Sequence, residues 1–456
     1  MVQQLEQTRS LITGRTLWLC ILLIGFAQSS LIPAGKIYSQ DWPAFLGPQG
    51  NGKSSEKLSN KSWESDGLKV KWSVKLGDGY GIGSVADGIV FQADRVDDQA
   101  RLQAIELESG DVRWTHKYKT DYVDMYGFDG GPRSSPVIDE GRVYFSGVEG
   151  MLYCLDAADG SEIWKVNTLE QFGVIQNFFG VGSSPIIYKD RLIVMVGGSP
   201  EESQSVNKGA LNLVKPNGSA IVAFNKLNGE VIYETGDDLA SYATPVLATL
   251  NGKESLLAFC RQKLWCFDAE TGDVRFDFPW QAKKFESVNA SCPLVIDNKI
   301  LLTESYGPGA VLLDVTEDRT EVIWKDEGRD RILESHWATP IEIDGFAYGC
   351  HGQHRGSAEL RCINLETGEV VWSEPGLQRT SLTYVDGHFV CLTENGRLLL
   401  LKVNPEKFEL VSEFSSTGES EQQPRFVYPC WAAPVIANGQ ILIRSKNLLT
   451  CFDLGN

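Results

Sequence analysis

The sequence predicts an all-β fold, an eight-bladed β-propeller of four-stranded antiparallel blades. Two observations lead to this prediction. A two-part motif recurs roughly every 40–50 residues, a spacing typical of propeller blades. Tight-turn pairs such as Asp-Gly, Asn-Gly and Thr-Gly separate short apolar runs, and they are typical of β-hairpins. No stretch longer than a few residues shows a strong helical period in its apolar residues.

Each repeat opens with a small residue and a proline before an apolar run, and it closes with a strand that ends in an aromatic residue. The proline steps lie at Pro136, Pro185, Pro245, Pro293, Pro340 and Pro434. The aromatic ends are Trp114, Trp164, Tyr233, Phe276, Trp324 and Trp372, with a weaker copy near Val411. The most regular copy is "MLYCLDAADGSEIW", in which the turn glycine supplies the positive φ that a tight hairpin requires.

The two ends of the chain each carry part of a repeat. The last copy, "LLTCFDLGN", stops after its third strand, whereas "LKVKWSV" around Trp72 is a fourth strand with no blade before it. We therefore expect Leu68–Val74 to complete the last blade. This pairing closes the ring and leaves no unpaired strand edge at the seam. The count is then eight blades, or seven if the degenerate unit near Ser381 is not a blade.

The first residues have the layout of a secretory signal. Arg9 and Arg15 precede the apolar run "TLWLCILLIGFAQSSLIPA", which ends in small residues. Cleavage is expected after Ser29, Ala34 or Ser39, and an uncleaved membrane anchor is the alternative. We expect the chain to be exported to the periplasm or cell envelope. The expected division is a signal peptide or anchor over 1–39, an N-terminal extension over 40–67 and a propeller over 68–456.

Charge and cysteine content narrow the classes of function. The net charge of −18 disfavours nucleic acid, because a phosphate backbone repels an acidic surface. Nine cysteines follow Cys20, an odd number that cannot pair completely within one chain. No CxxC pair at metal-site spacing and no haem-attachment motif is present, so no metal site is predicted. Cys154, Cys266, Cys362 and Cys451 occupy one strand position in four repeats, where other repeats have alanine. Cys350 and Cys391 lie in similar strand-like runs. All six are therefore predicted to be buried structural thiols.

The repeat resembles the pyrroloquinoline quinone (PQQ) repeat, whose pattern is small-Pro, an apolar strand and "LYALDAxTGxxxW". The resemblance covers 68–456 and is closest at 151–164. The opening "DWPAFLGPQGNG" at Asp41–Gly52 is similar to the start of exported PQQ-repeat proteins of planctomycete-type bacteria. The resemblance implies a propeller fold, and fold alone does not set function.

Two branches of this family imply different functions. Quinone-dependent alcohol and sugar dehydrogenases hold PQQ and Ca²⁺ in the propeller funnel. This chain lacks the adjacent Cys-Cys pair and the haem motif of that branch, and no motif here matches its calcium ligands or its catalytic Asp. The second branch is a non-catalytic lipoprotein of the outer-membrane assembly machinery. The chain is similar to that branch in size, but it has longer loops and lacks a lipobox.

Loop lengths point to one face of the propeller. The connections after the first and third strands are short, whereas those after the second and fourth strands hold almost all of the loop residues. Ligand-binding residues concentrate on loops held by a rigid scaffold. The residue three before each proline step should lie near the axis on this long-loop face. In two repeats that residue is Gly182 or Ala290, which has no functional group in its side chain. The candidate rim residues are Arg133, Tyr242, His336, Trp337, Arg379 and Trp431.

These residue types suit a planar anionic ligand, because aromatic rings stack and arginines pair with carboxylates. The alternative is that the aromatic residues only pack the inner rim of the blades. Two other clusters are interpreted as surface features. Asp121, Asp124 and Asp129 form an expected solvated acidic loop, since their spacing fits no calcium loop. His351 and His354 are expected surface polar residues, since they lack a third zinc ligand.

The sequence favours an exported, non-catalytic binding or scaffold protein that engages a protein or polysaccharide partner through its long-loop face. The alternative is a PQQ- and Ca²⁺-dependent oxidoreductase of the alcohol or sugar dehydrogenase type, with its cofactor in the funnel. No catalytic residue can be named for that alternative, and the oligomeric state is left open.

Overall fold

The computed structural model describes residues 40–63, 68–281, 289–414 and 416–455. All of them lie within one compact unit, Tyr38–Asn456. The signal peptide or anchor predicted for 1–39 falls outside the described residues. In the part of the chain that is described, no helix is both long enough and apolar enough to cross a membrane.

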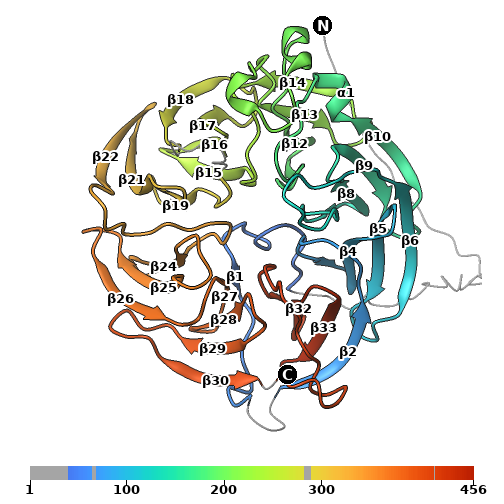
Figure 1. Cartoon of the computed structure of the whole chain (residues 1–456), viewed down its shortest axis with the longest axis vertical. Helices are drawn as coiled ribbons and strands as arrows, with labels where there is room; N and C mark the ends of the chain where they lie inside the picture. The colour runs from blue at the N-terminus through green and yellow to red at the C-terminus, as the bar shows by residue number, and fades with distance from the viewer. Residues whose placement is uncertain (1–39, 64–67, 282–288, 415, 456) are drawn as a thin grey trace, which may run out of the picture. The chain divides into compact units, whose positions relative to one another are not determined.

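Eight antiparallel sheets form a ring around a central axis, with the first strand of each sheet innermost (Figure 1). The prediction of eight blades is confirmed, and the unit near Ser381 forms blade 7, so the seven-bladed alternative is wrong. Blades 1 to 4 are formed by β3 (Ser84–Ala86), β4 (Ile89–Val96), β5 (Gln99–Glu106) and β6 (Val112–Lys119); β7 (Val137–Asp139), β8 (Arg142–Ser146), β9 (Met151–Asp156) and β10 (Glu162–Asn167); β11 (Ile186–Tyr188), β12 (Arg191–Met195), β13 (Ile221–Asn225) and β14 (Val231–Thr235); and β15 (Val246–Leu250), β16 (Lys253–Phe259), β17 (Lys263–Asp268) and β18 (Val274–Pro279).

The second half of the ring continues the same order. Three short helical segments lie in connecting loops of the first half, between β10 and β13. Blades 5 to 8 are formed by β19 (Leu294–Ile296), β20 (Lys299–Glu304), β21 (Gly309–Thr316) and β22 (Arg319–Lys325); β23 (Ile341–Ile343), β24 (Phe346–His351), β25 (Glu359–Asn364) and β26 (Val370–Pro375); β27 (Thr380–Val385), β28 (His388–Thr393), β29 (Leu398–Lys402) and β30 (Leu410–Phe414); and β31 (Val435–Ala437), β32 (Gln440–Arg444), β33 (Leu448–Asp453) and β2 (Lys69–Lys75). The helical segments are α1 (Thr168–Phe172), η1 (Glu201–Ser205) and η2 (Leu211–Leu213).

The two ends of the propeller sequence meet in blade 8. Strand β2 pairs antiparallel with β33, from Lys69 opposite Asp453 to Lys75 opposite Leu448. Figure 1 shows this blue strand along the outer edge of the red C-terminal blade. The predicted ring closure is confirmed, with the strand one residue later than expected. Strand β33 consequently lies between β2 and β32 and is not left with an open edge at the seam.

The aromatic residue that ends each repeat packs on the turn of the next blade. The ring of Trp114 covers Gly160, whose φ is +73°, and a Cβ there would lie 2.5 Å from the indole. The indole N–H of Trp114 also donates to the carbonyl of Ala157 at 3.0 Å. Across the seam, Trp72 makes the same kind of bond to the carbonyl of Leu107 at 2.9 Å. The aromatic end of one repeat therefore contacts the turn between the third and fourth strands of the next blade.

The cysteines are buried structural thiols, as predicted. All nine in the described residues are buried and unpaired. Burial raises the pKa of Cys154 to about 12 and that of Cys266 to about 11. The thiolate is the reactive form of cysteine, so these thiols are chemically quiet in the folded protein.

The N-terminal extension crosses the propeller axis. We call residues 41–56 the strap. It begins on blade 1, where Trp42 exchanges two backbone hydrogen bonds with Val85 at 2.8 and 2.9 Å. It ends on blade 7, where β1 (Lys53–Ser54) adds a fifth strand parallel to β27. In Figure 1 the blue strap passes through the middle of the ring to β27.

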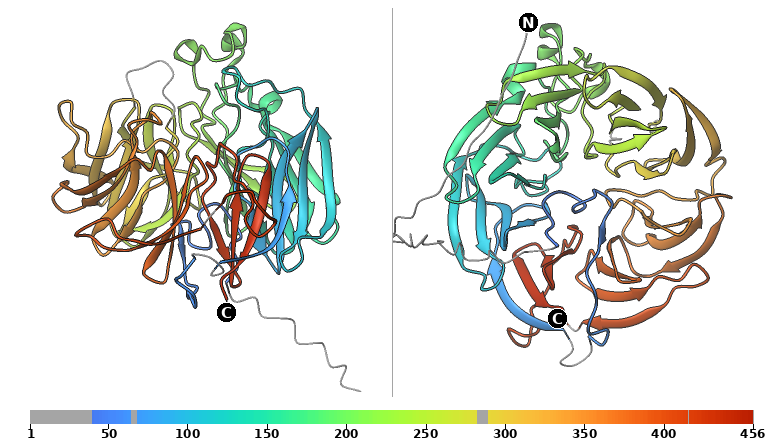
Figure 2. Two further views of the ribbon diagram at one scale, coloured as in Figure 1. Left: turned by 60° about the horizontal axis from the view of Figure 1, so that its bottom comes forward. Right: turned by 180° about the vertical axis from the view of Figure 1, so that it is seen from behind.

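The strap lies on the face that carries the short hairpin turns. Asp41 accepts the N–H of Asp87 at 3.1 Å in the turn between the first two strands of blade 1. The side-chain amide of Asn438, in the equivalent turn of blade 8, donates a hydrogen bond to the same carboxylate at 2.8 Å. Figure 2 shows the blue strap across the centre when the ring is seen from behind. The strap therefore closes the central channel at the short-turn face.

Candidate functional site

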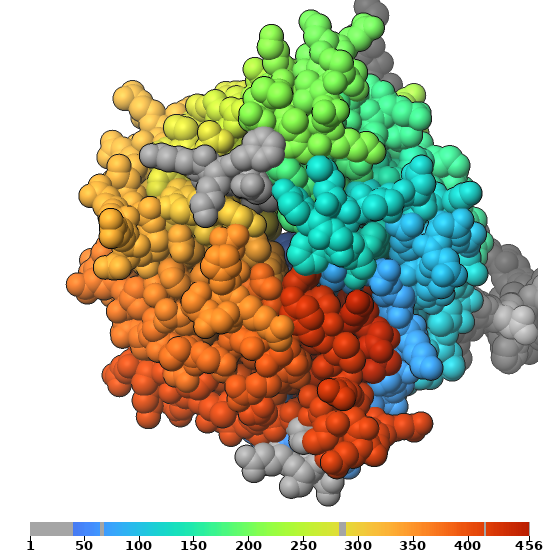
Figure 3. Space-filling model, in the orientation of Figure 1, coloured from blue at the N-terminus to red at the C-terminus, as the bar shows by residue number. Residues whose placement is uncertain are grey.

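A cavity of about 420 Å³ lies on the propeller axis and opens on the long-loop face. Figure 3 views this face, and dark blue atoms of the strap are visible at the bottom of the central hollow. Phe45 and Leu46 of the strap line the cavity. The channel is thus a cup with one open end, and its floor is apolar. We call this cavity the axial cup.

All six predicted rim residues line the axial cup. The structure brings together Arg133, Tyr242, His336, Trp337, Arg379 and Trp431, which come from five different blades. Most of them lie four residues before the first strand of a blade, where the chain turns from a long loop down toward the axis. Gly182 and Ala290 line the cup from the same position, as expected.

Sequence reasoning missed Tyr80, the rim residue of blade 1. It lies four residues before β3 and lines the cup, 4.7 Å from the ring of Trp431. Blade 1 has no proline step, so alignment on the prolines did not reach it. Counting back from the start of the strand would have found it. Phe128 and Phe179 also line the cup, and they come from the long loops themselves.

The aromatic rings of the cup form a connected wall. Trp431 lies 5.0 Å from Trp337 and 5.7 Å from Phe128, measured between ring centroids. Phe179 continues the wall, 5.7 Å from Phe128 and 5.6 Å from Tyr242. These are tilted and edge contacts, which aromatic pairs prefer over flat stacking. The wall is held by ring packing between loops of several blades.

Arg133 is already paired with a buried carboxylate. Its Nη2 donates to Asp124 Oδ2 at 2.7 Å, and its Nε donates to the carbonyl of Phe179 at 2.6 Å. The side chain of Asp124 is 0% exposed, and it also accepts the N–H of Tyr126 at 2.9 Å. The predicted solvated acidic loop is therefore wrong for Asp124, which is a buried counter-ion, whereas Asp121 is exposed.

Arg379 has the same arrangement on the opposite side of the ring. Its Nε and Nη2 donate to Glu394 Oε2 at 3.0 and 2.6 Å. The side chain of Glu394 is also 0% exposed, and it accepts the indole N–H of Trp431 at 3.2 Å. The guanidinium lies over the ring of Trp337, with its central carbon 4.5 Å from the ring centroid. Because each arginine has its own buried carboxylate, the wall of the cup carries no net charge from these pairs.

The two remaining rim residues are uncharged. Burial, followed by the nearby charge of Arg379, lowers the pKa of His336 to about 3. Its Nε2 lies 3.2 Å from the hydroxyl of Tyr306. The hydroxyl of Tyr242 accepts the N–H of Phe179 at 2.8 Å, and burial raises its pKa well above the ordinary value. A neutral imidazole and a neutral phenol complete the wall.

The side chains of the cup do not fit PQQ with Ca²⁺. PQQ is a tricarboxylate, and the two cationic side chains in the wall are neutralised by Asp124 and Glu394. These carboxylates are fully buried behind the arginines, so they cannot reach a cation in the cavity. Among the described residues, no group of three or more His, Cys, Asp or Glu side chains could hold a metal ion. The donor set instead suits a ligand without net charge.

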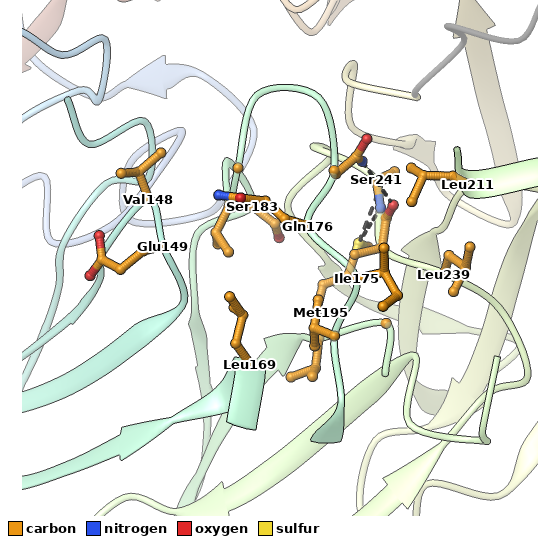
Figure 4. Close-up of a pocket in the computed structure, with 17 residues that line it drawn as sticks. Val148, Glu149, Leu169, Ile175, Gln176, Ser183, Met195, Leu211, Leu239 and Ser241 are labelled. Atoms are coloured by element: carbon orange, nitrogen blue, oxygen red, sulfur yellow. Dashed lines mark hydrogen bonds between the residues drawn. The ribbon is translucent and has the colours of Figure 1, made fainter. Parts of the chain in front are cut away.

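Two other features are not ligand sites. His351 is half-buried on β24, where its Nδ1 accepts the N–H of Glu334 at 3.1 Å and burial lowers its pKa to about 4. The expectation of a surface residue is wrong for His351, whereas His354 is exposed and lines the axial cup. A second cavity lies under the long loops of blades 2 and 3, between Glu149, Met195 and Ser241 (Figure 4). Its volume of about 30 Å³ has room for little more than water.

The fold and the cup define a closed-bottomed propeller of the PQQ-repeat class. A family model described as outer membrane protein assembly factor BamB matches residues 60–199 and 98–374. The two overlapping matches together span well over half of the chain. The chain belongs to this PQQ-like repeat family.

Solved structures agree at the level of the fold. BamB from Moraxella catarrhalis has a TM-score of 0.57 and 16% identity, covering 85% of this chain and 99% of that one. The quinohemoprotein alcohol dehydrogenase from Comamonas testosteroni has a TM-score of 0.52 and 14% identity, covering 93% and 82%. At such identities the likeness concerns the fold alone.

Curated relatives match over short stretches. The Comamonas testosteroni enzyme is 25% identical over 207 residues, which is 40% of this chain and 28% of that protein. The serine/threonine-protein kinase AfsK from Streptomyces griseus is 28% identical over 120 residues, which is 25% of this chain and 14% of that protein. The matches thus span under a third of either relative. They reflect the shared repeat in proteins with different names and activities.

Proposed function

We propose that the protein is an exported, non-catalytic binding protein that holds a partner protein on its long-loop face. One observation carries this proposal. Seven exposed apolar or aromatic side chains gather on the long loops, and we call them the loop patch: Val123, Met125, Tyr126, Phe128, Leu213, Val427 and Tyr428. Contiguous apolar surface of this kind marks interaction sites in soluble proteins.

Neighbouring rings and a buried cluster connect the three loops that carry the loop patch. Tyr126 lies 5.8 Å from Phe178, which belongs to the buried cluster under the loop that contains η2. Phe128 contacts Trp431 at 5.7 Å, and Trp431 contacts Tyr428 at 6.1 Å. The patch therefore adjoins the axial cup, whose lining includes Phe128 and Trp431. Aromatic residues and methionine are enriched at the centres of protein interfaces.

Family membership supports a protein partner. The matching family model carries the name of an outer membrane protein assembly factor, and an assembly factor acts by binding other proteins. The loop patch offers such a surface here, whereas the strap crosses the centre of the short-turn face. The predicted polysaccharide partner finds less support in the loop patch, because its most exposed members, Val123 and Leu213, are aliphatic.

Affinity capture from the native envelope tests the proposal, with the chain from Gln40 onward as bait. The patch variant Val123→Asp/Met125→Asp places two charges at side chains that are 80% and 48% exposed. The matched control, Val274→Asp/Val322→Asp, makes the same charge change on outer strands at side chains that are 52% and 45% exposed. We expect a specific partner to be captured by the wild type and the control but lost by the patch variant. Capture that is absent, or equal for all three baits, would contradict the proposal.

A further inference from the structure

We propose that the axial cup binds the terminal ring of an uncharged sugar chain. This inference concerns the cup, which shares Phe128 with the loop patch, and it does not rest on the proposed function. It also differs from the planar anionic ligand that the arginine and aromatic content of the rim suggested. Charge, unused donors, ring geometry and the closed floor each support it.

The first step is charge. Each arginine of the wall is held by its own buried carboxylate, Arg133 by Asp124 at 2.7 Å and Arg379 by Glu394 at 2.6 Å. An anion entering the cup would lose its water without meeting unpaired positive charge, and such desolvation is costly. A cation would also lose its water, and among the described residues no carboxylate lines the cup to replace it. An uncharged ligand meets neither cost.

The second step is hydrogen bonding. Nη1 of Arg133 makes no hydrogen bond with any described residue, although Nε and Nη2 are both used. Nη1 of Arg379 has only the carbonyl of Gln353 at 3.4 Å, which is long for a hydrogen bond. These N–H groups remain as donors beside the aromatic wall. Oxygen acceptors satisfy them, whereas a hydrocarbon ligand leaves them unpaired.

The third step is the shape of the aromatic wall. Tyr80 and Trp337 flank Trp431, at 4.7 and 5.0 Å, and their planes are inclined to it by 48° and 51°. The three rings are therefore inclined to one another and do not form a flat stack. A saturated sugar ring has an apolar C–H face and a rim of hydroxyl oxygens. It can place the first against the rings and the second toward the arginine donors.

The fourth step is the closed floor. The cavity of about 420 Å³ is within the range of about 300–1,000 Å³ found for small-molecule sites. Phe45 and Leu46 of the strap close its lower end. A polymer cannot thread through such a cup, so only the end of a chain can enter. The site therefore selects terminal sugar residues over internal ones.

The test uses the chain from Gln40 onward and a fixed set of probes. Cellobiose, maltose and N,N′-diacetylchitobiose are the neutral sugars. Glucuronic acid is the charged comparison, and N-acetyltryptophanamide stands for an aromatic side chain of a protein partner. Calorimetry gives affinity, and saturation-transfer NMR reports which ligand protons contact the protein. Each probe is titrated to about 10 mM, which detects a Kd of ~1 mM.

We expect saturable binding of at least one neutral disaccharide, with saturation transfer to the C–H protons of its terminal ring. Trp337→Ala removes part of the wall and should weaken binding about tenfold. Trp337→Phe keeps a ring and the fold, and it should weaken binding about threefold. Leu213→Ala, in the loop patch, should bind like the wild type. Far-ultraviolet circular dichroism and thermal midpoints establish that each variant is folded.

Three results would overturn the proposal. The first is that none of the neutral sugars binds. The second is that their binding is unchanged in both Trp337 variants while these remain folded. The third is preferential binding of glucuronic acid, or of N-acetyltryptophanamide, which would assign the cup to an anion or to a side chain of a protein partner. Loss of partner capture in the patch variant has no bearing on these outcomes, so the two proposals fail separately.

Discussion

The two faces of the propeller are built by different rules. The short-turn face repeats one arrangement, in which an aromatic residue such as Trp114 covers a turn glycine of the next blade. The long-loop face repeats only the position from which its rim residues start, and the residue type at that position changes from one blade to the next. Regular contacts hold the ring together on the first face, which leaves the second free to vary. The comparison teaches that stability and recognition are divided between the two ends of the same strands.

The largest expected effect concerns the regular contacts. Trp72→Ala removes a buried indole at the seam together with its bond to Leu107, and it should lower the free energy of unfolding by about 3–5 kcal/mol. Urea unfolding measures this change. Trp114→Ala is the matched control, because it removes the equivalent contact between blades 1 and 2. A loss below about 1 kcal/mol for Trp72→Ala alone would show that the seam does not hold the ring closed.

The next effect concerns a charge pair on the long-loop face. Glu394→Gln leaves Arg379 without its buried counter-ion, so we expect a loss of about 2–3 kcal/mol in unfolding free energy. The same variant should also make the cup net positive. PQQ should therefore raise the thermal midpoint of the variant protein, whereas it should not raise that of the wild type. A rise for the wild type itself would contradict the argument from charge and favour the oxidoreductase alternative.

A third effect depends on pH. Burial lowers the pKa of His336 to about 3, whereas an unfolded imidazole titrates near ~6.5. Below that value the unfolded state takes up the proton first, so stability present at neutral pH is lost as the pH falls toward 3. Between about pH 7 and pH 5 the loss from this group is about 2 kcal/mol.

Urea unfolding at both pH values, for the wild type and His336→Gln, measures that contribution. The variant should be less sensitive to pH by this amount, while it retains the similar contribution of His351, whose pKa burial lowers to about 4. Equal pH dependence in the two proteins would mean that folding does not lower the pKa of His336.

The smallest effect concerns the loop patch. Val123 is 80% exposed, so Val123→Asp should change unfolding free energy by no more than about 0.5 kcal/mol. Urea unfolding checks this. A larger loss would indicate that the loop is part of the folded core, and the patch variant could not then be used to test partner binding.

Much of the fold follows from the repeat. The proline steps and aromatic ends mark most strands, and the incomplete copies around Trp72 and Cys451 predict the seam. Each of these signals is local, because a hairpin needs its glycine and a strand its alternating burial. The rim positions of five blades follow for the same reason, since a fixed offset from a strand start has a fixed place near the axis.

The missed features depend on contacts between distant segments. Nothing near Glu394 in sequence indicates that it neutralises Arg379, because the two meet only when β28 and the loop before β27 are in place. The strap was predicted only as an extension, since "DWPAFLGPQGNG" has no strand pattern. Its role as a floor arises from pairing with Val85 of blade 1 and with Tyr384 of blade 7, on the two sides of blade 8. Loop residues gain such roles through tertiary position and not through local pattern.

The seam also sets an order for how the molecule can be made. Ser73 and Thr450 face each other at 3.2 Å although 377 positions separate them in the chain. A ribosome or an export channel delivers β2 first and β33 last, and domains begin to fold as they emerge. Blades 1 to 7 can form before β33 is available to pair with β2. The eighth blade, and with it the finished ring, can arise only after the whole chain has been released.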